Sequence, residues 1–256
     1  MISYHPDSRF LTDFASANLQ LSEAVCVSAH LEFCGKCRAH VQQLTDIGGH
    51  FLARMQPETL AEDSFKHLMS RIEAHEPSAH IVSDADLSAD YGGSSQSSGN
   101  TQRTEAARGK ASMLLPCALR RLSQGGLQNL GWVQLGKELR VAPLPIDAGV
   151  HRAHERETSI YDIKAGGRMP EHEHLGEEIT VLLRGSFSDA EGSYSRGDFV
   201  VRNAGEAHQP TATLDMDCLC LVSLERRVRP RYWFYRLLEP LVQYRLHKAM
   251  SRNLSA

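Results

Sequence analysis

The segment from Gly166 to Gly185 reads GGRMPEHEHLGEEITVLLRG. It has the spacing G-x5-H-x-H-x3-E-x6-G, in which His172 and His174 are two residues apart and Glu178 follows four residues later. Side chains at even spacing on a strand point to the same face, so we expect all three to face one side of a sheet. A second motif, G-x5-N-x-G-x2-H, begins at Gly197 and ends at His208.

Three histidines and one carboxylate that converge inside a small barrel suit Zn, Mn, Fe, Ni or Cu. The competing interpretation places the histidines on surface loops, although both motifs are improbable in this order by chance. The surrounding sequence consists of short apolar runs broken by Gly, Pro, Asn and Asp, which predicts an all-β sandwich or barrel. These runs are LRVAPL, TSIYDIKAG, EITVLLRGSF, DFVVRN and DCLCLVSL.

Both motifs resemble the two motifs of the cupins. The first matches at every position, whereas the second has Asn203 where proline is usual and Ala212 where the final asparagine is usual. The resemblance implies a β-barrel with His172, His174, Glu178 and His208 as the metal ligands.

Residues 1–76, at the other end of the chain, have helical apolar periodicity. We expect a first helix capped by Asp7 or Ser8, a second from about Ser22 to Cys34, a third from about Arg38 to Met55 and a fourth that starts at Pro57. These residues therefore predict an N-terminal four-helix domain.

A second candidate metal site lies in the sequence HLEFCGKC, which contains His30, Cys34 and Cys37. A helix places positions i and i+4 on one face, and the turn that follows brings the second cysteine to the same point. Such ligands suit tetrahedral Zn²⁺, with His5 as the best fourth ligand and His40 and His50 as weaker candidates. The alternatives are unligated thiols, or a thioredoxin-type redox pair, for which the βαβ context is absent.

Residues 1–76 resemble the anti-sigma domain of zinc-containing anti-sigma factors, and the resemblance implies His5, His30, Cys34 and Cys37 as the zinc ligands. Together with the cupin motifs, the chain resembles the ChrR family of anti-sigma factors. This implies a bacterial cytoplasmic protein whose helices hold an extracytoplasmic-function sigma factor and cover its polymerase-binding surfaces. The cupin would be the sensory half, which responds to singlet oxygen or organic peroxides.

The two predicted domains are separated by residues 77–112, which are rich in Ser and Gly and nearly free of large apolar residues. We expect a flexible linker here, which lets the domains move independently. Residues 113–256 would then form the cupin domain with a C-terminal helix, which Pro240 should end or kink.

The composition disfavours two classes of function, nucleic-acid binding and membrane insertion. The chain has 256 residues and a net charge of −3, so a direct nucleic-acid contact is disfavoured. No run of about 18 apolar residues occurs, which disfavours a membrane span. No acid–base pair can be assigned, and we therefore expect no catalytic residues and no enzyme. The alternative is a metal-dependent cupin enzyme, a dioxygenase or isomerase.

Cys218 and Cys220 lie in the sequence DCLCL, on one face of a predicted strand. Their position after His208 makes them a possible redox pair near the metal. The other interpretation, which the sequence favours, is that both are small buried apolar residues. Same-face positions on a strand are about 6.5–7 Å apart, so a disulfide between them would be strained.

Overall fold

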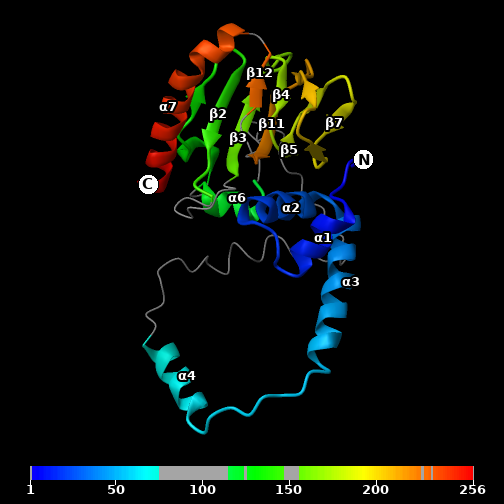
Figure 1. Ribbon diagram of the computed structural model, residues 1–256, viewed down its shortest axis with the longest axis vertical. Coiled ribbons are helices and arrows are strands. Elements are labelled where there is room, and N and C mark those ends of the chain that lie inside the picture. Colours follow the sequence, from blue (N-terminus) through cyan, green and yellow to red (C-terminus); the bar gives the residue numbers. More distant parts are fainter. Residues whose placement is uncertain are drawn as a thin grey trace, which may run out of the picture. The chain divides into compact units, whose positions relative to one another are not determined.

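The computed structural model describes residues 2–74, 115–123, 126–146, 156–225, 228–231 and 233–255 (Figure 1). The predicted linker, residues 77–112, lies outside these ranges. The chain divides into two compact units, the first built from residues 1–53 together with 114–256 and the second from residues 54–113. The three-part division expected from the sequence remains a proposal.

The fold class is confirmed, since N-terminal helices are joined to a β-structure that ends in a helix. The helices are α1 (Ser8–Ala15), α2 (Leu21–Phe33), α3 (Gly35–Leu52), α4 (Ser64–Glu73), α6 (Cys117–Leu122) and α7 (Trp233–Ser255), with a 3₁₀ turn η2 (Leu127–Asn129). The strands are β1 (Val133–Gln134), β2 (Leu139–Pro143), β3 (Glu157–Ile163), β4 (His172–His174), β5 (Glu178–Arg184), β6 (Ser186–Ser188), β7 (Ser193–Ser195), β8 (Phe199–Arg202), β9 (Ala207–His208), β10 (Thr211–Ala212), β11 (Cys218–Leu224) and β12 (Val228–Pro230).

The strands form three antiparallel sheets, which lie in the upper half of Figure 1. The largest has the order β1-β2-β3-β11-β5-β8, and the smaller ones have the orders β10-β6-β7 and β12-β4-β9. Strands β5 and β11 are buried along nearly their whole length because α2 contacts both of them. A strand that is covered on both faces reads as a continuous apolar run, which explains the sequences EITVLLR and CLCLVSL.

Local sequence explains where the N-terminal helices begin. The Asp7 side chain accepts a hydrogen bond from the Phe10 amide at 3.0 Å and caps α1. Helix α3 begins at Gly35, earlier than predicted, because the Cys34 sulfur accepts a hydrogen bond from the Cys37 amide. Helix α4 begins at Ser64, later than the predicted start at Pro57. Its regular apolar spacing also starts there and not at the proline.

Helix α7 packs on the β-structure and contacts β1, β2 and β12 (Figure 1). It continues through Pro240, so this residue does not end the helix, and the alternative expectation of a kink at Pro240 stays a prediction. Proline removes one backbone hydrogen bond and disfavours a helix interior. Packing of the rest of the helix against three strands offsets that cost, since most helical stability in proteins comes from tertiary contacts.

Helices α1–α3 belong to the same compact unit as the strands, and aromatic contacts join them. The rings of Phe10 and Phe199 meet edge to face at 5.5 Å, and the Arg196 guanidinium lies 4.7 Å from the centre of the Phe33 ring. Gly197 has φ +93°, and a Cβ there would lie 2.8 Å from Ile2 and 3.0 Å from Phe33. This position therefore requires glycine both for its backbone conformation and for the close approach of the helices.

A buried arginine also ties α2 to the strands. The Arg156 Nε donates to the Ser223 hydroxyl at 2.9 Å, and its Nη1 donates to Glu177 at 3.1 Å and to Glu23 at 3.4 Å. Glu23 belongs to α2, whereas Glu177 immediately precedes β5. One guanidinium therefore neutralises two carboxylates from opposite sides of the contact between the helices and the β-structure.

None of the helices in the described ranges combines the length and the apolar character that crossing a membrane requires.

Candidate metal centres

The structure brings His5, His30, Cys34 and Cys37 together near the N-terminus, with their ligand atoms within 4.8 Å of one another. We call these four residues the helical cluster. The His5 Nδ1 lies 3.4 Å from the Cys34 sulfur and 3.5 Å from the Cys37 sulfur. The weaker candidates, His40 and His50, are exposed on α3 and stand outside the cluster.

The chemistry of these donors fits a metal ion. The His30 Nδ1 lies 2.7 Å from the carbonyl oxygen of Gly197, which can only accept, so Nδ1 carries the proton. The His30 Nε2 then keeps its lone pair, is fully buried, and has no hydrogen-bond partner. A buried acceptor without a partner is costly, and a metal ion would satisfy it.

Burial lowers the pKa of His30, which keeps its ring neutral as a metal ligand must be. Burial and the neighbouring Cys34 raise the pKa of Cys37 to about 11. Without a cation the thiolate is therefore disfavoured, whereas a bound metal would stabilise it. Two cysteines and two histidines form a donor set that suits tetrahedral Zn²⁺.

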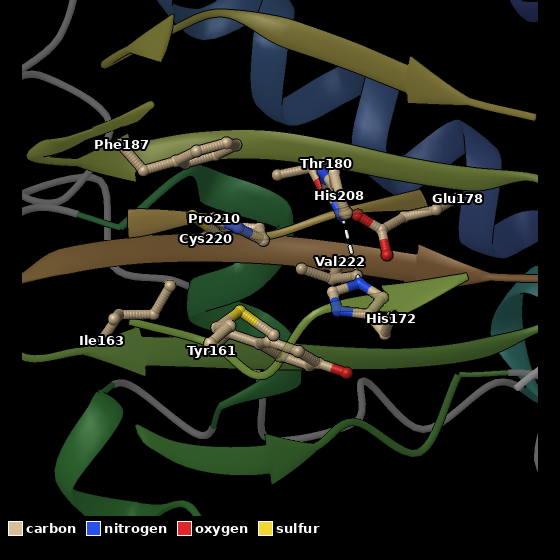
Figure 2. Close-up of a pocket in the computed structure, with 11 residues that line it drawn as sticks. Tyr161, Ile163, His172, Glu178, Thr180, Phe187, His208, Pro210, Cys220 and Val222 are labelled. Carbon is tan, nitrogen blue, oxygen red and sulfur yellow. Dashed lines mark hydrogen bonds between the residues drawn. The ribbon is translucent and has the colours of Figure 1, made fainter. Parts of the chain in front are cut away.

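The second group, which we call the barrel cluster, consists of His172, His174, Glu178 and His208. Their ligand atoms also lie within 4.8 Å of one another, and all four residues are buried. Strand β4 carries the first two histidines on one face, β5 begins at Glu178, and β9 pairs with β4 so that His208 lies opposite His172. Figure 2 shows His172 and His208 facing each other beside Glu178.

Hydrogen bonds aim the lone pairs of the barrel cluster at one point. The His172 Nδ1 donates to the Pro170 carbonyl at 2.9 Å, and the His208 Nδ1 donates to Asp189 at 2.9 Å. Both Nε2 atoms are thereby left as acceptors, yet they lie only 3.1 Å apart. Neither nitrogen of His174 has a hydrogen-bond partner. This arrangement fits a bound divalent cation.

Lowered pKa values also keep two histidines of the barrel cluster neutral. Burial lowers the pKa of His174 to about 4, against an opposing effect of Glu178. Burial, and then the neighbouring His172, lower the pKa of His208 to about 4. The Glu178 carboxylate accepts a hydrogen bond from the Thr180 hydroxyl at 2.8 Å, which orients it.

Asp189 is a residue of this site that the sequence did not reveal. Its fully buried carboxylate accepts hydrogen bonds from His208, from Arg202 at 3.0 Å and from the Tyr194 hydroxyl at 3.3 Å. Burial alone would raise the pKa of Asp189, but hydrogen bonds from His208 and Arg202 bring it below its usual value. Asp189 lies in the turn SDAEGS and belongs to no recognisable motif. Its role is visible only once the fold places it beside His208.

A small pocket of about 20 Å³ opens beside the barrel cluster (Figure 2). A volume of this order holds one or two waters. Its lining includes three ligand residues and the side chains of Tyr161, Met169 and Cys220. The barrel cluster therefore has an adjoining space in which oxidisable side chains lie close to the ligands.

Cys218 and Cys220 are both buried on β11, with their sulfur atoms 3.6 Å apart and no disulfide between them. The contact with Cys218, and then burial, raise the pKa of the Cys220 thiol, which disfavours its reactive thiolate. Both side chains pack in the apolar core with Leu182 and Phe187. A structural role accounts for these contacts, and a redox role remains a proposal.

Residues 125–227 match the family described as the ChrR cupin-like domain. The chain is also 26% identical, over 239 residues, to the anti-sigma-E factor ChrR of Cereibacter sphaeroides, a match that covers 93% of this chain and 97% of that protein. The resemblance to ChrR-type anti-sigma factors is confirmed. The match spans nearly the whole length of both chains.

Solved structures show that the ChrR-like chain shares a known fold. It matches the crystal structure of Rhodobacter sphaeroides SigE in complex with the anti-sigma ChrR with a TM-score of 0.64 and 24% identity, covering 88% of this chain and 99% of that one. An RmlC-like cupin protein from Ralstonia eutropha JMP134 aligns with a TM-score of 0.34 and 18% identity over 39% of this chain and 65% of its own.

Proposed function

We propose that the chain is a cytoplasmic anti-sigma factor that binds an extracytoplasmic-function sigma factor and keeps it from RNA polymerase. The observation that carries this proposal is the match to the anti-sigma-E factor ChrR, which spans nearly the full length of both proteins. A regulator needs no turnover, so the barrel would serve as a sensor and not as an enzyme. Direct contact with nucleic acid or membrane is not part of the proposal.

Exposed apolar side chains on α3 support a protein partner. Ile47 and Phe51, one helical turn apart, are 55% and 69% exposed, and Leu52 is 70% exposed. Exposed apolar patches of this kind are typical of protein interaction sites. We propose that this face of α3 binds an apolar surface of the sigma factor that polymerase would otherwise contact.

The second unit has an apolar face of its own. Phe65, Leu68, Met69 and Ile72 follow the i, i+3, i+4, i+7 spacing of an amphipathic helix on α4, and all four are exposed. A helix that leaves this face uncovered gains stability when a partner buries it. We propose that α4 binds the sigma factor in this way.

We propose Zn²⁺ for the helical cluster, and Zn²⁺ or another divalent transition metal for the barrel cluster. A bound zinc ion would cross-link the N-terminal segment, the end of α2 and the start of α3. Ligation by His5, His30, Cys34 and Cys37 would thereby fix the direction of α3. This supports the exposed face of α3 as a partner surface.

Phe51→Glu tests the proposed partner surface. We expect the dissociation constant for the cognate extracytoplasmic-function sigma factor to rise at least about thirtyfold, because a central interface aromatic typically contributes about 2 kcal/mol or more. Co-expression, size exclusion and titration calorimetry measure the complex. Gln43→Glu, which adds the same charge to an exposed position of the same helix, should leave the affinity within about twofold. Equal affinities for both variants would contradict this surface.

We further propose that the barrel cluster senses oxidants, either singlet oxygen or an organic peroxide. The small pocket supports this proposal, because an oxidant that reaches the ligands also meets Cys220 and Met169. Sulfur side chains are the usual targets of such oxidants. In this scheme damage at the barrel weakens the hold of the helices on the sigma factor.

Release of the sigma factor from the purified complex tests the sensing proposal. Treatment with an organic peroxide, or light with a photosensitiser, should free the sigma factor, and the His172→Ala/His174→Ala variant should not respond. If the cysteines are the oxidised groups, Cys218→Ala/Cys220→Ala should also suppress release. A complex that stays intact under both oxidants would contradict sensing while leaving the anti-sigma role in place.

A further inference from the structure

One hairpin of the barrel supports ligands of both metal clusters. Residues 189–198, which we call the connecting hairpin, contain the β6–β7 turn, strand β7 and the turn into β8. In Figure 1 the N-terminus lies close to β7. We propose that this hairpin couples the two clusters thermodynamically, so that a metal bound in the barrel cluster raises the metal affinity of the helical cluster.

At one end the connecting hairpin holds the barrel cluster. The Asp189 carboxylate accepts from the His208 Nδ1 at 2.9 Å, and it also accepts from the Tyr194 hydroxyl at 3.3 Å. Partners of this kind set the orientation of a ligating histidine, and their loss typically weakens metal binding about 10–100-fold. The position of His208 is therefore tied to the position of Tyr194.

At the other end the connecting hairpin holds both histidines of the helical cluster. The Gly197 carbonyl accepts from the His30 Nδ1 at 2.7 Å. The Asp198 carboxylate accepts from the backbone amides of Ser3 at 2.7 Å and Tyr4 at 3.1 Å, immediately before His5. The hairpin thus contacts His30 directly and positions His5 through the two residues that precede it.

An aromatic pair joins the two ends. The rings of Tyr4 and Tyr194 contact each other with their centres 4.7 Å apart, and Tyr194 is buried. The Tyr4 carbonyl also accepts from the Phe199 amide at 3.0 Å, which fixes the segment on β8. Contacts therefore run without a gap from His208 through Asp189, Tyr194 and Tyr4 to His5.

The sign of the coupling follows from this order of contacts. When a metal fixes His208, the bond from its Nδ1 to Asp189 is also fixed, and Asp189 in turn holds Tyr194 against Tyr4. His5 is then held in place before it binds, so the helical cluster loses less freedom on taking up its own metal. Such coupling is reciprocal, and its usual size is about 5–150-fold in affinity.

The inference rests on the metal binding proposed for both clusters and does not depend on any sigma factor. Cobalt(II) is a suitable probe, because only the helical cluster contains thiolates and can show a thiolate-to-cobalt charge-transfer band. Titration of the full chain in a competing chelator gives the cobalt affinity of that cluster. We expect the affinity to fall about tenfold when His172→Ala/His174→Ala disables the barrel cluster.

Tyr4→Ala tests the route. In proteins that carry Tyr4→Ala, adding His172→Ala/His174→Ala should change the cobalt affinity of the helical cluster by less than about twofold. In proteins that carry Tyr4→Phe, which keeps the ring, the same addition should still lower that affinity about tenfold. Tyr244→Ala, at an exposed tyrosine of α7, is the matched control and should also retain it. Circular dichroism checks that each variant is folded.

Two results would overturn the inference. If the helical cluster binds cobalt equally well with an intact and with a disabled barrel cluster, the two clusters are not coupled. If the tenfold difference is still found with Tyr4→Ala, the coupling does not pass through Tyr4. Neither result depends on sigma binding, which the Phe51→Glu experiment tests separately.

Discussion

Replacement of Cys34 and Cys37 with serine is expected to empty the helical cluster and to abolish tight binding of the sigma factor. The two thiolates are half of the donor set, and the His5 Nδ1 lies within 3.5 Å of both sulfur atoms. Structural zinc contributes about 10–16 kcal/mol of apparent binding free energy in small zinc-binding peptides. Loss of even a fifth of this stabilisation would weaken the complex at least about thirtyfold.

The structure indicates that this loss would be local. Phe10 packs on Phe199 and α2 contacts β5 and β11, so the barrel retains part of the helical region without metal. Helix α3 instead rests mainly on α1 and α2, and Cys37 is its only buried residue. We therefore expect the variant to keep its barrel while α3 loses its fixed direction.

Metal analysis, circular dichroism and titration calorimetry would measure the effect of the double substitution. Cys117→Ser is the matched control, since Cys117 is exposed and stands outside both clusters. It should retain one zinc in the helical cluster and full affinity. Tight binding by a zinc-free double variant would contradict the proposed role of the metal.

Arg156→Met is expected to lower the free energy of unfolding by about 3 kcal/mol. Removing one partner of a buried ion pair typically costs 3–5 kcal/mol, because the other charge is left buried and unpaired. Here Glu23 and Glu177 lose the charge of Arg156, but Glu177 keeps some access to water and a second partner, the Arg9 guanidinium at 3.6 Å, so the lower end of that range applies. Arg156→Lys should recover only part of the loss, since one ammonium cannot reproduce the fork of contacts.

Urea unfolding measures this prediction, and Arg231→Met is its control. Arg231 pairs with Glu171 but is 67% exposed, and an exposed pair contributes at most about 1 kcal/mol. Combining Arg156→Met with Glu23→Gln and Glu177→Gln should restore much of the stability, because no uncompensated charge is then buried. An Arg156→Met protein as stable as the original would show that the guanidinium does not hold α2 on the barrel.

Ligand spacing within one element could be predicted from the sequence because it follows from helix and strand geometry. His30 and Cys34 are four residues apart at the end of a helix, and His172 and His174 are two apart on a strand. His5 and His208 come from other elements, and their assignment came from the resemblance to known motifs and from position. The structure brings each of them to its cluster.

The partners of these ligands could not be predicted, because they depend on tertiary packing. Gly197 meets His30 across 167 positions of the chain, and Arg156 meets Glu23 across 133. The composition of residues 77–112, from which separate domains were expected, carries no signal of contacts between the helices and the barrel. The structure shows such contacts at Phe10, Arg156 and Asp198.

The first compact unit is assembled from both ends of the chain, residues 1–53 and 114–256. Covalent continuity through residues 54–113 is therefore not what holds the helical cluster beside the barrel. A protease that cut once within this stretch would produce two fragments that remain associated as a non-covalent heterodimer. Cleavage would alter the second unit, which carries α4, while leaving both metal clusters and the hairpin between them intact.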